Sequence, residues 1–209
     1  MFADYLRIVC ERELGYRVAG SAATLARGIE LCRWHRPDLL LLDLDLPDGN
    51  ALDRMEEIRA ATPGSKILAV SILTDEFTMW RLAEAELDGF VDKYKTDMEA
   101  LIGTIGRVLK GVACFSPVVA EVRRKMQHDP RGCWPLTLTP RELQVIALRA
   151  GGSSEQEAAA QLGVSAETAE THWRKAMRKL GLHRGNDLIR WALEKGLARL
   201  DPRTAAGRD

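Results

Sequence analysis

Asp43, Ser71 and Lys93 each stand at the end of a short apolar run of the sequence. The run before Asp43, residues 39–42, consists of leucine alone. Apolar runs of this length are typical of buried parallel strands, and open α/β sheets carry their sites at the carboxyl ends of such strands. We therefore expect a carboxylate, a hydroxyl and an ammonium group to meet at one edge of a sheet.

These three groups together indicate a phosphoryl-acceptor site. The Asp43 carboxylate would attack phosphorus, while the Ser71 hydroxyl and the Lys93 ammonium group would bind the transferred oxygens and stabilise their charge. Taken singly, Ser71 is more simply a polar residue at a strand end, and Lys93 a solvated loop lysine. Their spacing relative to Asp43 favours the phosphoryl-acceptor interpretation.

A second set of polar side chains lies on a helix expected from Ser165 to about Leu180. Residues 169, 173, 176 and 180 are apolar, and their spacing places them on one packing face. Another face offers donors and acceptors that suit the base edges and phosphates of DNA. That face and its flanks hold Glu167, Glu170, Thr171, Arg174, Lys175, Arg178 and Lys179.

Boundary signals place this helix in an all-helical segment after Leu138. Thr139, Pro140 and Glu142 combine an N-cap, a proline at the first helical position and a capping-box glutamate. That helix should end at glycines 151–152. Further signals are a capping box from Ser154 to Glu157, a turn at Gly163 and a fourth helix over residues 186–195. Capped helices around a glycine turn indicate a helix-turn-helix, with a plain solvated helical bundle as the alternative.

The first half of the chain alternates short apolar runs with amphipathic stretches. This pattern is typical of a parallel sheet covered by helices, with Pro37, Pro63 and Gly64 as breakers. We expect strands over residues 16–19, 38–44, 66–71 and 89–91, and helices over residues 22–36, 51–61, 74–87 and 98–109. The sequence therefore predicts an α/β domain.

Residues 138–196 resemble the LuxR-type helix-turn-helix of NarL/FixJ-type response regulators, and residues 1 to about 110 resemble their receiver domain. The resemblance implies a flavodoxin-like α/β domain with an incomplete parallel sheet, followed by an all-α helix-turn-helix domain of four helices. The matching residues are Leu138-Thr139-Pro140-Arg141-Glu142, Leu162-Gly163-Val164-Ser165, Thr168, His172, Arg178-Lys179-Leu180-Gly181, and Phe90 three residues before Lys93.

The resemblance also implies roles for the residues of the DNA-binding domain. Glu170, Thr171 and Arg174 would face the bases, whereas Lys175, Arg178 and Lys179 would lie nearer the phosphates. Many family members carry lysine at the position of Glu170; a glutamate there lowers phosphate attraction and can accept from cytosine N4. For His172 a structural role is favoured over a base contact. The dimer contact candidates are Leu188, Ile189, Ala192 and Leu193, for which core packing is equally open.

For the receiver, the resemblance implies phosphorylation of Asp43 by a sensor histidine kinase, coupled to movement of Ser71 and Phe90. A receiver normally begins with a central strand that ends in two acidic residues holding Mg²⁺, and the sequence as given starts after that point. Either the chain is a truncated product of a longer gene, or its receiver is degenerate. Truncation is favoured because the other site residues are present.

Cofactor and compartment expectations follow from the same residues. Mg²⁺ is expected only if the receiver is complete upstream of Met1, since Asp43 and Asp45 alone are a poor ligand pair. The chain is 46% hydrophobic and 29% charged, with zero net charge, and lacks an apolar run of the ~20 residues that span a membrane. Without such a run, no membrane contact is expected. The cysteines form no Cys-x-x-Cys pair, so a cytoplasmic protein is expected.

We expect a receiver-like domain over residues 1–115, a linker over 116–136, the DNA-binding domain over 137–200 and a tail over 201–209. The leading hypothesis is a transcription regulator of a two-component phosphorelay, which binds duplex DNA as a homodimer under control of Asp43 phosphorylation. The alternative is a phosphorylation-independent regulator whose degenerate receiver serves dimerisation. An aspartate-nucleophile phosphohydrolase is remote, because Asp45 has the right spacing but no metal-binding acidic loop follows, and no catalytic residues are assigned.

Overall fold

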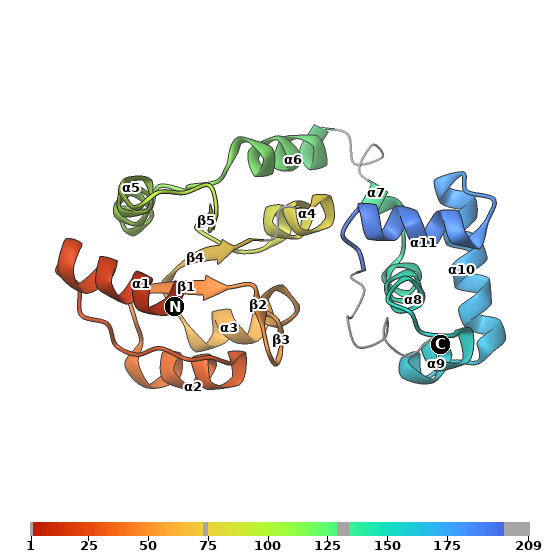
Figure 1. Cartoon of the computed structure of the whole chain (residues 1–209), viewed down its shortest axis with the longest axis horizontal. Helices are drawn as coiled ribbons and strands as arrows, with labels where there is room; N and C mark the ends of the chain where they lie inside the picture. The colour runs from red at the N-terminus through yellow and green to blue at the C-terminus, as the bar shows by residue number, and fades with distance from the viewer. Residues whose placement is uncertain (1, 73–74, 129–133, 199–209) are drawn as a thin grey trace. The chain divides into compact units, whose positions relative to one another are not determined.

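The computed structural model describes residues 2–72, 75–128 and 134–198 (Figure 1). The chain divides into two compact units. One holds the described residues of 1–74 and 81–120, and the other those of 75–80 and 121–198. The expected tail lies outside the described residues, as does part of the expected linker. No described helix is long and apolar enough to cross a membrane.

Within the described residues, a parallel sheet in the order β1-β4-β5 forms the centre of the first unit. Its strands are β1 (Leu39–Asp43), β4 (Lys66–Ser71) and β5 (Gly89–Asp92). Asp43 pairs with Val70, and Ser71 pairs with Asp92, so the three strands end at the same edge. Three of the four expected strands are therefore confirmed to within one residue at each end.

Helices cover both faces of this sheet, as a parallel sheet requires. Figure 1 shows α5 on the side of the sheet opposite α2 and α3. On the α5 side, a buried cluster joins Val9, Leu68, Val91 and Ile105. The helices of this unit are α1 (Phe2–Ile8) with a π-helical turn over Val9–Glu13, α2 (Leu25–His35), α3 (Met55–Ala61) after a 3₁₀ turn over Ala51–Arg54, and α5 (Met98–Leu109). A further helix, α4 (Glu76–Glu84), contributes residues 81–84 to this unit and residues 76–80 to the other.

The strand expected over residues 16–19 is wrong, since this segment has no strand conformation. A groove of about 1190 Å³ runs along β1 and is lined by Val18, Ala19 and the whole of β1. A strand obtains its hydrogen bonds from a neighbouring strand. Among the described residues only β4 pairs with β1, so residues 16–19 have no ladder to join. A small hairpin of β2 (Asp45–Leu46) and β3 (Gly49–Asn50) follows β1 and was not predicted.

The second unit contains the expected helices of the C-terminal segment. The capping boxes at Thr139 and Ser154 are confirmed, with each side chain bonded to the backbone three residues on. Gly163 ends α9 in the left-handed conformation, with a φ of 65°, which glycine adopts without strain. The helices are α6 (Pro117–His128), of which residues 121–128 lie in this unit, α7 (Trp134–Thr137), α8 (Pro140–Ala150), α9 (Glu155–Leu162), α10 (Ala166–Leu180) and α11 (Gly185–Glu194).

One hydrophobic core holds α8, α9, α10 and α11 together. Ile146 of α8 and Leu188 of α11 are fully buried, and Trp173 of α10 is almost fully buried. The apolar face predicted for α10 is confirmed, because Ala169, Trp173 and Ala176 are buried and Leu180 packs beside them. This burial fixes which side of α10 faces solvent.

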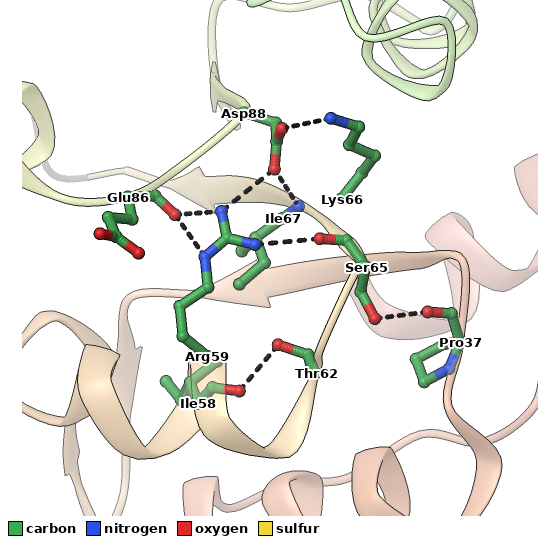
Figure 2. Close-up of polar contacts among 9 residues, drawn as sticks. All are labelled: Pro37, Ile58, Arg59, Thr62, Ser65, Lys66, Ile67, Glu86 and Asp88. Atoms are coloured by element: carbon green, nitrogen blue, oxygen red, sulfur yellow. Dashed lines mark hydrogen bonds and ion pairs between the residues drawn. The ribbon is translucent and has the colours of Figure 1, made fainter.

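Arg59 ties the first unit together at the end of the sheet where β4 and β5 begin (Figure 2). Its guanidinium group extends from α3, donating to the Ser65 carbonyl at 2.9 Å and to the Glu86 carbonyl. It also lies 3.2 Å from Asp88, whose carboxylate accepts from the Ile67 N–H at 2.8 Å and from Lys66 Nζ at 2.9 Å. The network therefore fixes the starts of β4 and β5 relative to α3.

This network makes the stability of the chain depend on pH. Burial raises the pKa of Asp88, but hydrogen bonds from the Ile67 N–H, Lys66 and Arg59 outweigh it and leave the pKa below its ordinary value. A carboxylate with a lowered folded-state pKa stabilises the fold above its unfolded pKa of about 3.9 and loses that contribution as pH falls. We therefore expect Asp88→Asn to be destabilising at pH 7 and progressively less so at lower pH.

Urea unfolding between pH 7 and pH 3 measures the stability gap between the natural chain and Asp88→Asn. The matched control is Glu99→Gln, which changes an exposed carboxylate of α5 and should follow the natural chain throughout. A gap that stays constant over the whole range would contradict the assignment.

Candidate functional sites

The predicted acceptor residue Asp43 is the last residue of β1 and faces Lys93, which follows β5. Lys93 Nζ lies 2.5 Å from Asp43 Oδ2. The Lys93 side chain is 16% exposed and that of Asp43 35%, so the carboxylate is partly exposed to solvent while its partner is largely covered. Lys93 Nζ also lies 5.0 Å from the centre of the Phe2 ring. The ammonium group is thus held between a carboxylate and an aromatic face.

Ser71 lies at the same edge of the sheet, as the last residue of β4. It is buried, and its carbonyl accepts a hydrogen bond from the Lys93 N–H at 3.0 Å. Phe90 lies in the middle of β5 and is also buried. Asp43 and Ser71 therefore end adjacent strands and Lys93 follows the third, all at the same edge of the sheet. Phe90 lies on the strand that leads to Lys93.

The acceptor edge does not by itself supply a magnesium site. Mg²⁺ prefers octahedral oxygen ligands, usually one or two carboxylates with waters and phosphate oxygens. No group of three or more His, Cys, Asp or Glu side chains suited to a metal occurs among the described residues. Asp43 Oδ2 is already bound to Lys93, and Asp45 donates its backbone N–H towards Asp43 Oδ1 at 3.4 Å. The described residues at this edge do not fit a resident Mg²⁺.

α10 forms the second candidate site, a polar surface opposite its buried face. Thr171, Arg174, Lys175, Arg178 and Lys179 are exposed, whereas Glu170 is partly buried. His172 is also partly buried, and its buried Nδ1 atom has no hydrogen-bond partner among the described residues. The exposed residues place several cationic groups and a hydroxyl along one helix.

Glu170 contacts two arginines within the domain. Its Oε1 atom accepts from Arg174 Nε at 2.8 Å, and its Oε2 atom accepts from Arg149 Nη1 at 3.0 Å. Arg174 lies four residues after Glu170, one turn further along α10, and the sequence alone indicates that residues at this spacing are neighbours on a helix. Arg149 belongs to α8, and no local sequence signal identified it.

Lys179 is also engaged inside the domain. Its Nζ atom lies 2.8 Å from Oε2 of Glu142, which is the buried capping-box residue of α8. Burial raises the pKa of Glu142, but hydrogen bonds from Lys179 and the Thr139 N–H outweigh it and hold the pKa below its ordinary value. Lys179, expected near the phosphates, thus balances a buried charge.

The dimer contact candidates divide by burial. Leu188 and Ala192 have no exposed surface and belong to the core, which is the alternative that the sequence left open. Ile189 and Leu193 are partly exposed and pack against the edge of that core. A dimer contact through these α11 candidates therefore depends on Ile189 and Leu193.

Comparisons with known proteins divide the chain in the same way as the two sites. Residues 1–105 match the model of the response regulator receiver domain, and residues 136–192 match that of the luxR family of bacterial regulatory proteins. The oxygen regulatory protein NreC of Staphylococcus epidermidis is 32% identical over 187 residues, covering 84% of this chain and 85% of NreC. A nitrate/nitrite response regulator homolog of Haemophilus influenzae is 28% identical over 179 residues, covering 85% of this chain and 84% of the relative.

The fold is also similar to that of solved structures. RcsB of Salmonella enterica serovar Typhimurium, bound to the promoter rprA, superposes with a TM-score of 0.61 at 20% identity. The match covers 90% of this chain and 91% of RcsB. At this identity the likeness concerns the fold alone.

The Lys179–Glu142 pair leads to a stability prediction. Lys179→Met leaves a buried carboxylate without its cation, so we expect a loss of about 1–2 kcal/mol, reduced from the usual cost because Lys179 is partly solvated. Lys175→Met is the matched control on the same helix, and as an exposed-site change it should cost less than about 0.5 kcal/mol. Chemical unfolding of both variants measures the difference. Equal stabilities of the two variants would contradict a structural role for Lys179.

Proposed function

The chain belongs to the response regulators, in which a receiver domain precedes a LuxR-family DNA-binding domain, and from this premise we propose specific roles for α10 and Asp43. It is a DNA-binding transcription regulator of the NarL type. We propose that α10 reads duplex DNA and that Asp43 is the phosphoryl acceptor that controls it.

The exposed face of α10 is the observation that carries the DNA-binding proposal. In a helix-turn-helix the second helix enters the major groove and the preceding helix braces it. The α9–α10 pair, with its glycine turn, has this form. Arg174 suits a bidentate contact with guanine, and Thr171 suits a single contact with a base edge. Lys175 and Arg178 supply charge for the phosphates.

We propose that the chain binds as a homodimer on paired half-sites. A solved structure shows two RcsB dimers bound to two parallel DNAs, and this chain shares that fold with a TM-score of 0.57. Ile189 and Leu193 are the α11 side chains with surface available for such a contact. We propose the same domain limits as the sequence predicts, residues 1–115 for the receiver and residues 137–200 for the DNA-binding domain.

Control by phosphorylation rests on the Asp43–Lys93 pair. In the unphosphorylated chain the Lys93 ammonium group neutralises the Asp43 carboxylate. Once Asp43 accepts a phosphoryl group, the negative charge lies on the phosphoryl oxygens, and the same ammonium group is placed to bind them. Ser71 and Phe90 would transmit the change from the adjacent strands. The proposed phosphoryl donor is a sensor histidine kinase, and the proposed compartment of the chain is the cytoplasm. The alternative, a phosphorylation-independent regulator that dimerises through its receiver, uses the same α10 surface without Asp43 chemistry.

The DNA-binding role predicts how binding changes with salt. Arg178→Ala removes one phosphate contact, so affinity should fall by a similar factor on every sequence and the slope of log K against log salt should decrease by about 1. Fluorescence anisotropy with a selected duplex and a random duplex at several salt concentrations measures both quantities. The control is Lys110→Met, which neutralises an exposed lysine after α5 in the first unit. A variant with an unchanged salt slope would contradict a phosphate contact by Arg178.

The regulatory role predicts a covalent change at Asp43. After incubation with acetyl phosphate, both with and without Mg²⁺, the mass of the intact chain is compared with that of Asp43→Asn; the natural chain should gain the mass of one phosphoryl group, and Asp43→Asn should gain none. Asp53→Asn changes another exposed carboxylate of the same unit and should behave like the natural chain. No gain by the natural chain would favour the phosphorylation-independent alternative. Steady release of phosphate from a phosphate ester would instead indicate the phosphohydrolase, because a regulator is not expected to hydrolyse an ester repeatedly.

A further inference from the structure

The carboxylate of Glu170 lies between two arginines of the DNA-binding domain. Each of its oxygens accepts a hydrogen bond from a different guanidinium group, at 2.8 Å from Arg174 and 3.0 Å from Arg149. The side chains of Glu170 and Arg149 are 25% and 23% exposed, whereas that of Arg174 is 74% exposed. The three residues thus run from a covered cation, through a covered anion, to an open cation.

Arg149 anchors this row to the hydrophobic core. Its guanidinium carbon lies 4.0 Å from the centre of the Trp173 ring, and Trp173 itself is buried in the core. A guanidinium group stacked on an aromatic face has few alternative positions. Because Arg149 is held in this way, the carboxylate that it binds is also held.

The bond to Glu170 orients Arg174 without using the end of its side chain. Glu170 accepts from the Nε atom of Arg174, one helical turn away. The two Nη groups form the outer end of the guanidinium fork, and a paired set of N–H donors suits the O6 and N7 atoms of guanine. A free arginine side chain would lose rotamer entropy on docking, and a side chain already held loses less.

The same geometry disfavours Glu170 as a direct reader of bases. A carboxylate that accepts from cytosine N4 must reach the groove, but both oxygens of Glu170 are bonded inside the domain and the side chain is three-quarters covered. The two arginines also neutralise its charge, which lowers the repulsion between α10 and the phosphates.

We infer that Glu170, anchored by Arg149, is a positioning residue that orients Arg174 to read guanine. This inference rests on the proposed DNA-binding function and deepens it. Arg174 makes the base contact, and Glu170 and Arg149 act only through Arg174. Sequence preference at the Arg174 position of the DNA site therefore depends on a residue that does not touch DNA.

The test is selection of binding sites from a random duplex library with the full chain, followed by affinity measurements on guanine-containing and substituted duplexes. Arg174→Ala identifies the guanine that Arg174 contacts. Glu170→Ala should lower the preference for that guanine by about tenfold, within the range that one bidentate contact provides, while affinity for random duplex rises because a negative charge is lost. Glu170→Gln, which keeps one acceptor, should give an intermediate loss.

A double-mutant comparison separates positioning from direct reading. In the Arg174→Ala background, Glu170→Ala should alter base preference by less than about twofold, since coupled residues are not additive. Arg149→Met should reproduce the loss of guanine preference, because it releases the anchor. The control Glu194→Ala removes an exposed carboxylate of α11 and should leave base preference unchanged. Thermal unfolding of each variant shows that the domain is folded.

Each contrary outcome has a distinct meaning. Retention of full guanine preference by Glu170→Ala would overturn the inference and leave the proposed function intact. Loss of preference at a cytosine, independent of Arg174, would overturn it in favour of direct reading by Glu170. Selection of no sequence by the natural chain would overturn the proposed function and the inference together.

Discussion

Burial of Trp173 is the interaction on which the geometry of the DNA-binding domain depends. An α-helix has 3.6 residues per turn, so fixing the side of α10 that carries Trp173 also fixes the side that faces solvent. Ala169 and Ala176 share the buried side and belong to the same core. The same ring supports Arg149. One aromatic side chain thus sets both the outward face of α10 and the position of a cation beside it.

In the first unit the corresponding constraint is the register of the parallel sheet. Pairing of β1 with β4 and of β4 with β5 brings Asp43 and Lys93 to one edge although 50 residues separate them along the chain. The Arg59–Asp88 network holds the opposite edge, where the starts of β4 and β5 meet α3. The two ends of the sheet therefore differ: one is densely hydrogen-bonded, and the other carries the partly exposed carboxylate of Asp43.

Elements with strong local signals could be predicted from the sequence. The Thr139 and Ser154 capping boxes and the apolar runs of β1, β4 and β5 each contain their own evidence within a few residues. Features that depend on distant partners could not be predicted. Residues 16–19 have the composition of a strand but no ladder to join, and Arg149 reaches Glu170 only because α8 packs on α10. The burial of Leu188 likewise depends on the assembled core.

The account depends most on α10 as the DNA-reading helix, and a structure of the chain bound to its selected duplex tests this directly. We predict that α10 lies in the major groove, with Arg174 Nη atoms about 3 Å from guanine O6 and N7. Glu170 should still bind both Arg149 and Arg174 in that complex. A structure in which the DNA contacts another surface, with α10 outside the groove, would contradict the account.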